Sequence, residues 1–581
     1  MILSRQLTSF DDQNGQTGFE LQPHTPNRGR SGGAGTNRLP RLEGRHRRGG
    51  LTAPPICRTI AVMRHSRTVA PAARAESFPQ FRRAATLRAV WLVVLLLPAI
   101  PCGTATGNDS LARPNIVVIL ADDLGIGDPT CYNRESKIQT PNVDRIAREG
   151  MRFSDVHSAS SVCTPTRYAI LTGRYAWRTR MKSGVLQGYS RALIEARRPT
   201  VASLLRDAGY VTAAFGKWHL GFQEFDPRES ESKQPVEYAR PLRPGPVTIG
   251  FDEFFGIPAS LDMPPYLFVE NDHPVEMPTA TIGDSGDAKY ARGPFWRGGA
   301  IAPSFRHADV LPRITERAVT FIDRQAKSGP HKPFFLYFAL TAPHTPYLPS
   351  HSFRGQSGAG DYGDFVSMVD ASVGEILSGL ERNRLTDQTF VIMTSDNGAR
   401  WTPEEIRQFG HHSNLNNRGQ KSDIFEGGHR IPFLARWPGK IRAGSTSDEL
   451  GCLVDLLATC AAVAGVPLPT NAAEDSFSLL PAILSQPLDR PIRDAVVHHS
   501  GGGMFAIRSG DWKLVLGLGS GGFTRPAFVN PKPGEPAGQL YNLATDRQET
   551  MNVYAQHPEI VRSLTEKLQR IQRAGRSRPA G

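Results

Sequence analysis

The chain is poor in cysteine and has no hydrophobic run long enough to cross a membrane. Six cysteines occur among 581 residues, and no disulfide framework of the kind that staples small secreted proteins is implied. The clearest apolar run, residues 89–100, is 12 residues long, whereas a membrane helix needs about 20. We also find no internal repeat. A transmembrane helix, a disulfide scaffold and a repeat array are therefore not expected.

The spacing of the cysteines points the same way. Two lie near the N-terminus and four lie further along the chain: Cys57 and Cys102, then Cys131, Cys163, Cys452 and Cys460. We expect Cys452 and Cys460 to share one helix, where eight residues at 1.5 Å each separate them by about 12 Å. That separation is too large for a disulfide.

A basic surplus of the kind that binds nucleic acid is absent from most of the chain. The net charge is +13, and residues 1–106 carry 15 Lys and Arg against 5 Asp and Glu. This stretch therefore accounts for +10 of the net charge of +13, and residues 107–581 keep only +3. No nucleic-acid partner is expected.

Residues 1–106 have the pattern of a leader that contains a secretory signal peptide. Arginines between 82 and 88 precede the apolar run 89–100, and small residues follow up to Ala105. Met63 is a candidate true start, because it gives a signal peptide of ordinary length. We expect an exported protein, periplasmic or secreted, without a stable membrane span. A buried helix is the alternative interpretation of the run.

From residue 114 onward, apolar strands alternate with helices. Strands are expected at 115–120, 153–157, 210–215, 333–340, 389–394 and 433–437, and helices at 140–150, 200–208, 311–326, 362–382 and 453–465. This alternation predicts an α/β fold for residues 107–465, a large mostly parallel sheet sandwiched by helices. Residues 226–310 show no clear period, and we expect long loops that build specificity there.

Residues 466–581 predict a smaller C-terminal subdomain. A linker-like stretch at 466–486 comes first, and four short strands follow at 495–499, 505–508, 513–516 and 539–543. An amphipathic helix is expected at 558–574. Together these elements predict a small antiparallel sheet with one helix.

One short motif concentrates chemical signals. Cys163-Thr164-Pro165-Thr166-Arg167 is followed by an apolar stretch that ends in Thr172-Gly173-Arg174. Pro165 suits a first helical turn and Gly173 suits a helix end, so Cys163 is expected at a helix N-terminus. Such an end attracts anions. A thiol there could be a nucleophile or a redox group, and a buried structural cysteine is the other interpretation.

Polar residues follow four of the expected strands. They are Asp122 and Asp123, Lys217 with His219, His344, and Asp396 with Asn397. The carboxyl ends of parallel strands form the edge where ligands bind. Adjacent carboxylates are costly unless a positive group, such as a hard cation, lies between them. Taken one by one, the alternatives are turn-capping aspartates, a solvated lysine and a core histidine.

With these motifs together, residues 113–465 resemble the sulfatase family, which has an alkaline-phosphatase-like fold. The resemblance rests on the C-x-P-x-R and T-G-R motifs and on the polar residues at the strand ends. It implies an arylsulfatase-like sulfuric ester hydrolase that acts on a sulfated carbohydrate or an aryl sulfate. It also implies that a formylglycine-generating enzyme oxidises Cys163 to formylglycine.

The resemblance further implies a metal site. Asp122, Asp123, Asp396, Asn397 and the hydrated formylglycine at 163 would hold one Ca²⁺, or Mg²⁺ in some contexts, through oxygen ligands. One hydroxyl of formylglycine would attack sulfur in line, with Asp396 as the proton acceptor.

The remaining roles come from the resemblance as well. His344 or Lys421 would give a proton to the departing alcohol, and His219 would deprotonate the second hydroxyl, which expels sulfate. Arg167 and Lys217 would steady formylglycine. Lys217 and Lys421 would bind the oxygens of the transferring SO₃ group.

Two alternatives belong to other functional classes. A phosphatase or phosphonate hydrolase of the same fold would use zinc or manganese ligands richer in His, with Ser or Thr as nucleophile. A non-catalytic protein that binds sulfated glycans would have lost at least one member of the set, and none is missing.

Overall fold

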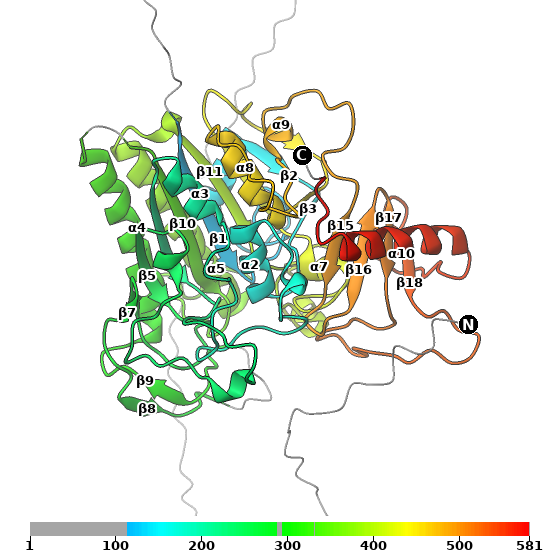
Figure 1. Ribbon diagram of the computed structural model, residues 1–581, viewed down its shortest axis with the longest axis horizontal. Helices are drawn as coiled ribbons and strands as arrows, with labels where there is room; N and C mark the ends of the chain where they lie inside the picture. The colour runs from blue at the N-terminus through cyan, green and yellow to red at the C-terminus, as the bar shows by residue number, and fades with distance from the viewer. Residues whose placement is uncertain (1–112, 287–292, 330–331, 580–581) are drawn as a thin grey trace, which may run out of the picture. The chain divides into compact units, whose positions relative to one another are not determined.

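A ten-stranded sheet forms the centre of the computed structural model (Figure 1). The structure describes residues 113–286, 293–329 and 332–579, so the expected leader, with its apolar run and Met63, lies outside the described residues. The strands are ordered β13 (Ser445–Ser447), β2 (Met151–Phe153), β12 (Phe433–Arg436), β11 (Thr389–Ser395), β1 (Asn115–Asp122), β10 (Phe334–Pro343), β4 (Val211–Lys217), β5 (Glu253–Ile257), β6 (Val269–Glu270) and β7 (His273–Pro274).

The five strands in the middle of this sheet are parallel. Strand β1 pairs with β10 on one side and β11 on the other, so that Val118 lies opposite Tyr337 and Ile392. Strands β4 and β5 continue the parallel order beyond β10, while β12, β6 and β7 pair antiparallel. Every residue of β1, β10 and β11 is buried, as expected for strands covered on both faces. The predicted mostly parallel sheet is confirmed.

Two groups of helices pack around the sheet. One consists of α1 (Pro141–Glu149), α4 (Val310–Lys327) and α5 (Gly360–Arg382). The other consists of α2 (Cys163–Thr172), α3 (Val201–Asp207) and α8 (Leu456–Val463). Helix α4 buries Leu311, Ile314, Ala318, Phe321 and Ile322, which recur at the helical period.

A small antiparallel sheet follows in the C-terminal part. Its strands are β15 (Val496–His499), β16 (Phe505–Ser509), β17 (Trp512–Val515) and β18 (Gln539–Asn542), and α10 (Pro558–Arg573) packs on the central pair. Leu564 and Leu568 of α10 share a buried cluster with Tyr175 and Trp177 of the larger part. The two parts thus have a common core, and the boundary between residues 465 and 466 stays a prediction. None of the helices in the described residues is long and apolar enough to span a bilayer.

The expected helix that joins Cys452 to Cys460 is wrong. Cys452 lies in strand β14 (Gly451–Cys452) and Cys460 lies in α8, with a 3-10 turn, Leu453–Asp455, between them. The turn forms because Asp455 Oδ2 accepts a hydrogen bond of 2.9 Å from the Cys452 backbone N–H. All four cysteines of the described residues are free thiols.

Three stretches also differ from their expected secondary structure. Residues 226–310 contribute β5, β6 and β7 to the main sheet, and two further strands, β8 (Ala280–Ile282) and β9 (Gly299–Ile301). Residues 153–157 contain the end of β2 and a separate strand, β3 (Val156–His157). The linker-like stretch 466–486 holds α9 (Leu480–Ile483), and Leu479 with Ile483 is buried in the main core.

Candidate active site

The parallel strands deliver charged side chains to one edge of the sheet. Asp122 ends β1, Lys217 ends β4, His344 follows β10 and Asp396 follows β11. Because these strands are neighbours, their carboxyl ends lie side by side. Cys163 is the first residue of α2, all ten of whose residues are buried, and Gly173 ends the helix with a left-handed φ of 63°. The expected position of Cys163 at a helix N-terminus is confirmed.

Carboxylate and amide groups form the floor of this site. The Sγ atom of Cys163 lies 3.6 Å from Asp122 Oδ1. Asn397 Nδ2 donates to Asp123 Oδ1 at 2.8 Å, and the Asp123 backbone N–H donates to Asp396 Oδ1 at 3.2 Å. Asp123 adopts a left-handed φ of 69°, which turns the chain sharply after β1.

Three cations lie against the three carboxylates. Lys217 Nζ is 2.6 Å from Asp122 Oδ2 and Lys421 Nζ is 2.7 Å from Asp123 Oδ1. Arg167 Nε donates to Asp396 Oδ2 at 2.9 Å, and its Nη1 donates to the Lys217 carbonyl at 3.0 Å. Each of these charges is buried, so every pair compensates a desolvation penalty that an unpaired charge would bear in full.

The electrostatics of the floor follow from burial and from these pairs. Burial alone would raise the pKa of Asp122, but Lys217, His344 and Arg167 outweigh it and hold that pKa below its usual range. Burial and the neighbouring Asp122 raise the pKa of Asp396. Burial, with Asp396 next, also raises the pKa of the Cys163 thiol, which therefore stays protonated as an unmodified side chain.

The donor set suits a hard cation. Asn397 Oδ1 is buried and has no hydrogen-bond partner among the described residues, so this oxygen is available as a metal ligand. Ligand atoms of Asp122, Asp123, Cys163 and His344 lie within 4.8 Å of one another. Carboxylate and amide oxygens are the ligands that Ca²⁺ and Mg²⁺ prefer. The residues present therefore fit such an ion.

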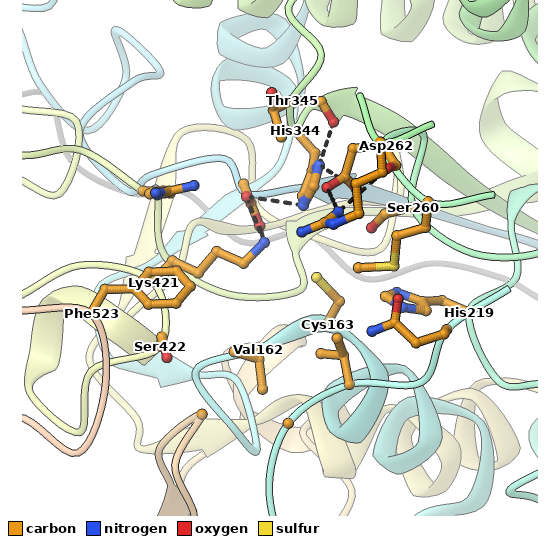
Figure 2. A pocket seen from close by; sticks show the side chains of 18 of the residues that line it. Val162, Cys163, His219, Ser260, Asp262, His344, Thr345, Lys421, Ser422 and Phe523 are labelled. Atoms are coloured by element: carbon orange, nitrogen blue, oxygen red, sulfur yellow. Dashed lines mark hydrogen bonds and ion pairs between the residues drawn. The ribbon is translucent and has the colours of Figure 1, made fainter. Parts of the chain in front are cut away.

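Two histidines lie on the walls above the floor (Figure 2). His219 Nε2 is 2.7 Å from the Leu186 carbonyl, which it meets as a donor, while its Nδ1 is buried without a partner among the described residues. Burial, then Lys217 and Arg167, lower the pKa of His219 well below its usual value, so the ring is a neutral acceptor. His344 Nδ1 contacts the Thr345 carbonyl at 2.6 Å, and its Nε2 is 3.8 Å from Asp123 Oδ2.

All ten residues expected from the sequence thus gather at one place, and their roles remain predictions. The structure adds residues that the sequence analysis missed, in a pocket of about 270 Å³ above Cys163. These pocket residues include Gln187, Ser260, Asp262, Arg297, Tyr347, Arg400 and Phe523. Asp262 is buried and paired with Arg297. In the sequence, Asp262 lies between Leu261 and Met263, and a carboxylate in such apolar surroundings could have marked it as a candidate. No local pattern marks the other pocket residues.

The geometry agrees with the comparisons. The sulfatase family model matches residues 114–466. The chain belongs to the sulfatase family. An N-acetylgalactosamine-6-O-sulfatase of Bacteroides thetaiotaomicron is 34% identical over 79% of this chain and 93% of its own length. Human arylsulfatase A is 34% identical over 81% of this chain and 89% of its own length.

A solved structure supports the same assignment. A sulfatase from the glycosaminoglycan metabolism of Bacteroides thetaiotaomicron superposes with a TM-score of 0.68 at 33% identity, covering 79% of this chain and 99% of that one. The alkaline-phosphatase-like fold and the sulfuric ester hydrolase activity expected from the sequence are thereby confirmed. A phosphatase or phosphonate hydrolase, and a protein that only binds sulfated glycans, are disfavoured.

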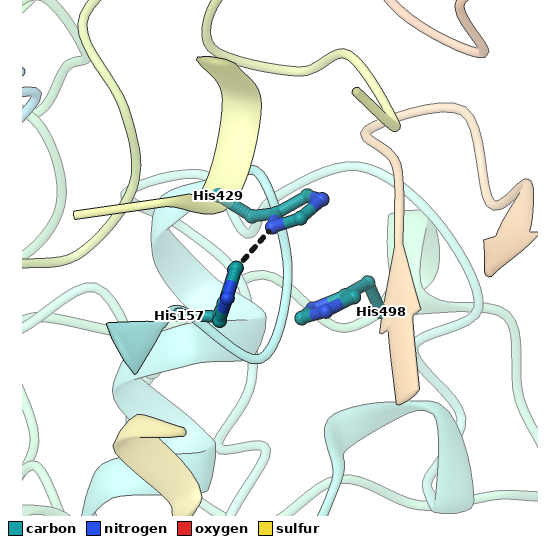
Figure 3. Close-up of side chains that lie close together, drawn as sticks. All are labelled: His157, His429 and His498. Carbon is teal, nitrogen blue, oxygen red and sulfur yellow. Dashed lines mark hydrogen bonds between the residues drawn. The ribbon is translucent and has the colours of Figure 1, made fainter. Parts of the chain in front are cut away.

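A second cluster of possible metal ligands lies where the two parts of this sulfatase meet. His157 of β3, His429 of α7 (Glu426–His429) and His498 of β15 are fully buried together (Figure 3). The rings of His429 and His498 stack at 3.9 Å with an angle of 11°. Parallel rings hold their nitrogen lone pairs in separate planes, so they cannot both bind one ion in this arrangement.

Hydrogen bonds explain the histidine cluster better than a bound metal ion does. Lys513 Nζ is 2.9 Å from His429 Nε2, the Nδ1 atoms of His429 and His157 are 3.0 Å apart, and His157 Nε2 is 2.8 Å from Asp155 Oδ1. If Lys513 donates to His429, each neutral ring can donate to the next group, as far as Asp155. Burial is the largest cause that lowers the pKa of all three histidines. The lowered pKa values favour neutral rings, and hydrogen bonds link His429 and His157 to both parts of the chain.

Proposed function

We propose that this sulfatase removes the 6-sulfate of N-acetylgalactosamine in sulfated glycans, with formylglycine at position 163 and one bound Ca²⁺. The observation that carries the proposal is the buried set of oxygen atoms beside Cys163 that could bind a metal ion, with the unpartnered Asn397 Oδ1 among them. The substrate class is supported by the similarity to N-acetylgalactosamine-6-sulfatases. Mg²⁺ is an alternative ion.

The bound ion would take oxygen ligands from Asp122, Asp123, Asp396 and Asn397 and would offset the negative charge of the sulfate. Formylglycine, as a hydrated aldehyde, supplies two hydroxyls, one to attack sulfur and one whose deprotonation releases sulfate. Sulfate binding and the proton transfers would be performed by side chains of the protein.

The side chains divide into charge carriers and proton carriers. Lys217 and Lys421 would bind the oxygens of the transferring group, since both ammonium groups lie at the floor, and Arg167 would fix the nucleophile and Asp396. His344, which lines the pocket, would give a proton to the departing sugar oxygen, with Lys421 as the alternative donor. His219 would accept a proton at Nδ1, which is free of other partners in the described chain.

The pocket offers groups for the sugar as well. Asp262 Oδ1 is a buried acceptor without a hydrogen-bond partner among the described residues. Its other oxygen pairs with Arg297, whose side chain is 44% exposed. We propose that these two residues bind hydroxyl groups of the sugar that carries the sulfate.

Maturation and location complete the proposal. A formylglycine-generating enzyme would convert Cys163 during synthesis. Export to the periplasm or the medium is supported by the basic and apolar residues at 82–105.

A substrate panel tests the proposal. Purified protein is given 6-sulfated and 4-sulfated N-acetylgalactosamine, 6-sulfated N-acetylglucosamine and nitrophenyl sulfate, and released sulfate is measured. We expect the 6-sulfated galactosamine to be the best sugar substrate, and Asp123→Ala to be inactive. Chelation should abolish activity and lower the melting temperature, and Ca²⁺ should restore both. Hydrolysis of the other sugars in preference to 6-sulfated N-acetylgalactosamine would refute the substrate, and peptide mass spectrometry showing only an unmodified thiol at 163 would refute the nucleophile.

A further inference from the structure

A loop of the C-terminal sheet carries an exposed aromatic ring at the mouth of the pocket. Phe523 lies between β17 and β18, is 47% exposed and lines the pocket on the side of Lys421 (Figure 2). Nine large apolar side chains are exposed in the part of the chain that the structure describes, and four of them belong to this loop: Leu516, Phe523, Phe528 and Val529. An exposed ring at the mouth of a pocket is a candidate contact for a ligand.

The loop holds Phe523 in a fixed position beside the catalytic residues. Gly522 packs so closely that a Cβ atom there would lie 2.3 Å from the Ser422 carbonyl oxygen. On the other side, Thr524 donates to Asp423 through its backbone N–H at 3.0 Å and through Oγ1 at 2.5 Å. Both neighbours of Phe523 are thus anchored to the segment that carries Lys421. The ring is preformed, and little entropy would be lost when a ligand binds it.

One side of the ring already has a partner. The guanidinium of Arg400 lies 5.1 Å from the Phe523 ring centroid, a cation–π distance. Arg400 also lines the pocket. The contact orients the ring, and the exposed remainder of Phe523 is available to a ligand.

The size of the pocket indicates what that ligand is. A volume of about 270 Å³ lies just below the roughly 300–1,000 Å³ of drug-sized sites, so the pocket has room for one sulfated sugar and not for two. In a glycan, the next sugar unit must then lie at the mouth, where Phe523 is. The C–H face of a pyranose ring is apolar and packs well on an aromatic face.

We propose that Phe523 forms a subsite for the sugar unit joined to the sulfated one, which it binds by stacking. This inference rests on the proposed function, because it requires a glycan substrate. It predicts that the protein prefers an oligosaccharide to the free sulfated monosaccharide.

Two substrates and three variants test the subsite. The substrates are 6-sulfated N-acetylgalactosamine and a disaccharide in which a second sugar is linked to it. Phe523→Ala should lower kcat/KM for the disaccharide by about 5- to 15-fold, the scale of one aromatic contact. The same variant should change kcat/KM for the monosaccharide by less than about twofold. Phe523→Trp should keep the preference. Phe528→Ala removes another exposed ring of the same loop, 60% exposed and outside the pocket, and should change neither value.

The outcomes separate the subsite from the proposed function. If the wild type hydrolyses both sugars and Phe523→Ala loses equally on both, or on neither, the subsite is wrong while the proposed function stands. If the wild type hydrolyses neither sugar but cleaves nitrophenyl sulfate, the proposed function is wrong and the subsite with it.

Discussion

Cys163 is the residue on which the proposed chemistry depends. Its Sγ atom lies beside Asp122 and at the helix N-terminus, a place where negative charge that develops during attack is stabilised. Burial raises the pKa of the unmodified thiol, so that the thiol would be a poor nucleophile. Formylglycine differs from any unmodified side chain because it has a second hydroxyl for the release of sulfate.

Cys163→Ser should therefore stop after one reaction. The Ser hydroxyl can take the sulfuryl group and release the sugar alcohol, but it has no second hydroxyl with which to expel sulfate. We expect one equivalent of alcohol and a stable sulfate ester, detected by intact-mass analysis. Repeated turnover by Cys163→Ser at the wild-type rate would contradict the formylglycine proposal.

His344 is the second residue whose role can be separated from its neighbours. A sugar alkoxide needs a proton as its bond to sulfur breaks, whereas nitrophenolate leaves with little help. His344→Ala should lose about 10²–10⁴-fold on a sulfated sugar, the usual scale of general acid catalysis, and distinctly less on nitrophenyl sulfate. Single-turnover cleavage rates measure this difference. Equal losses on both substrates would mean that His344 only binds sulfate, and Lys421 would then be the acid.

The residues of the floor were predictable and those of the pocket walls were not. Asp122, Lys217, His344 and Asp396 are each at or next to the end of a strand whose apolar run is visible in the sequence. Phe523, by contrast, comes from a loop far along the chain and reaches the site because Gly522 packs on Ser422 and Thr524 bonds to Asp423. Long-range packing of this kind leaves no local pattern.

At the scale of elements, α1 depends on a residue of another helix. Thr140, the residue before α1, makes no side-chain hydrogen bond that caps the N-terminus of the helix. Asp370 of α5 supplies the acceptor instead. Its Oδ1 accepts hydrogen bonds from the backbone N–H groups of Val143, at 2.8 Å, and Asn142, at 3.0 Å. Burial raises the pKa of Asp370 to about 6 in spite of these bonds, so the carboxylate is ionised at pH 7.5.

Asp370→Ala should destabilise the protein by about 1–3 kcal/mol, because it leaves buried donors of α1 unsatisfied. Asp370→Asn keeps one acceptor oxygen and should cost less. Thermal melting at pH 7.5 measures both variants. A melting temperature of Asp370→Ala equal to that of the wild type would show that α1 does not need this cap.

The elements that were predicted differ from those that were missed in length and burial. Strands β1, β10 and β11 have seven to ten residues, all buried, and their apolar runs are unambiguous. Strands β6 to β9 have only two or three residues and are partly exposed, so side-chain pattern carries little information about them. Only their pairing partners determine that these segments are strands.

At the scale of the whole molecule, buried polar groups join the large sheet to the small one. Arg508 of β16 pairs with Asp155 at 2.6 Å, and Lys513 of β17 pairs with Glu426 at 3.1 Å and with Glu549 at 2.7 Å. The histidine cluster lies between these pairs. Protonation of both His157 and His429 would set two N–H donors against each other across 3.0 Å.

This junction should make the folded protein sensitive to acid. Burial lowers the pKa of His498 in the folded state, whereas an unfolded His titrates near 6.5. Below about pH 6.5 the unfolded chain therefore binds more protons than the folded one, and stability falls by up to about 1.4 kcal/mol per pH unit for each such His. Between pH 7 and 5 the melting temperature of His498→Gln should fall by about 2–4 °C less than that of the wild type. His351→Gln, at an exposed position, is the matched control and should follow the wild type; the same fall in all three proteins would mean that acid acts elsewhere in the molecule.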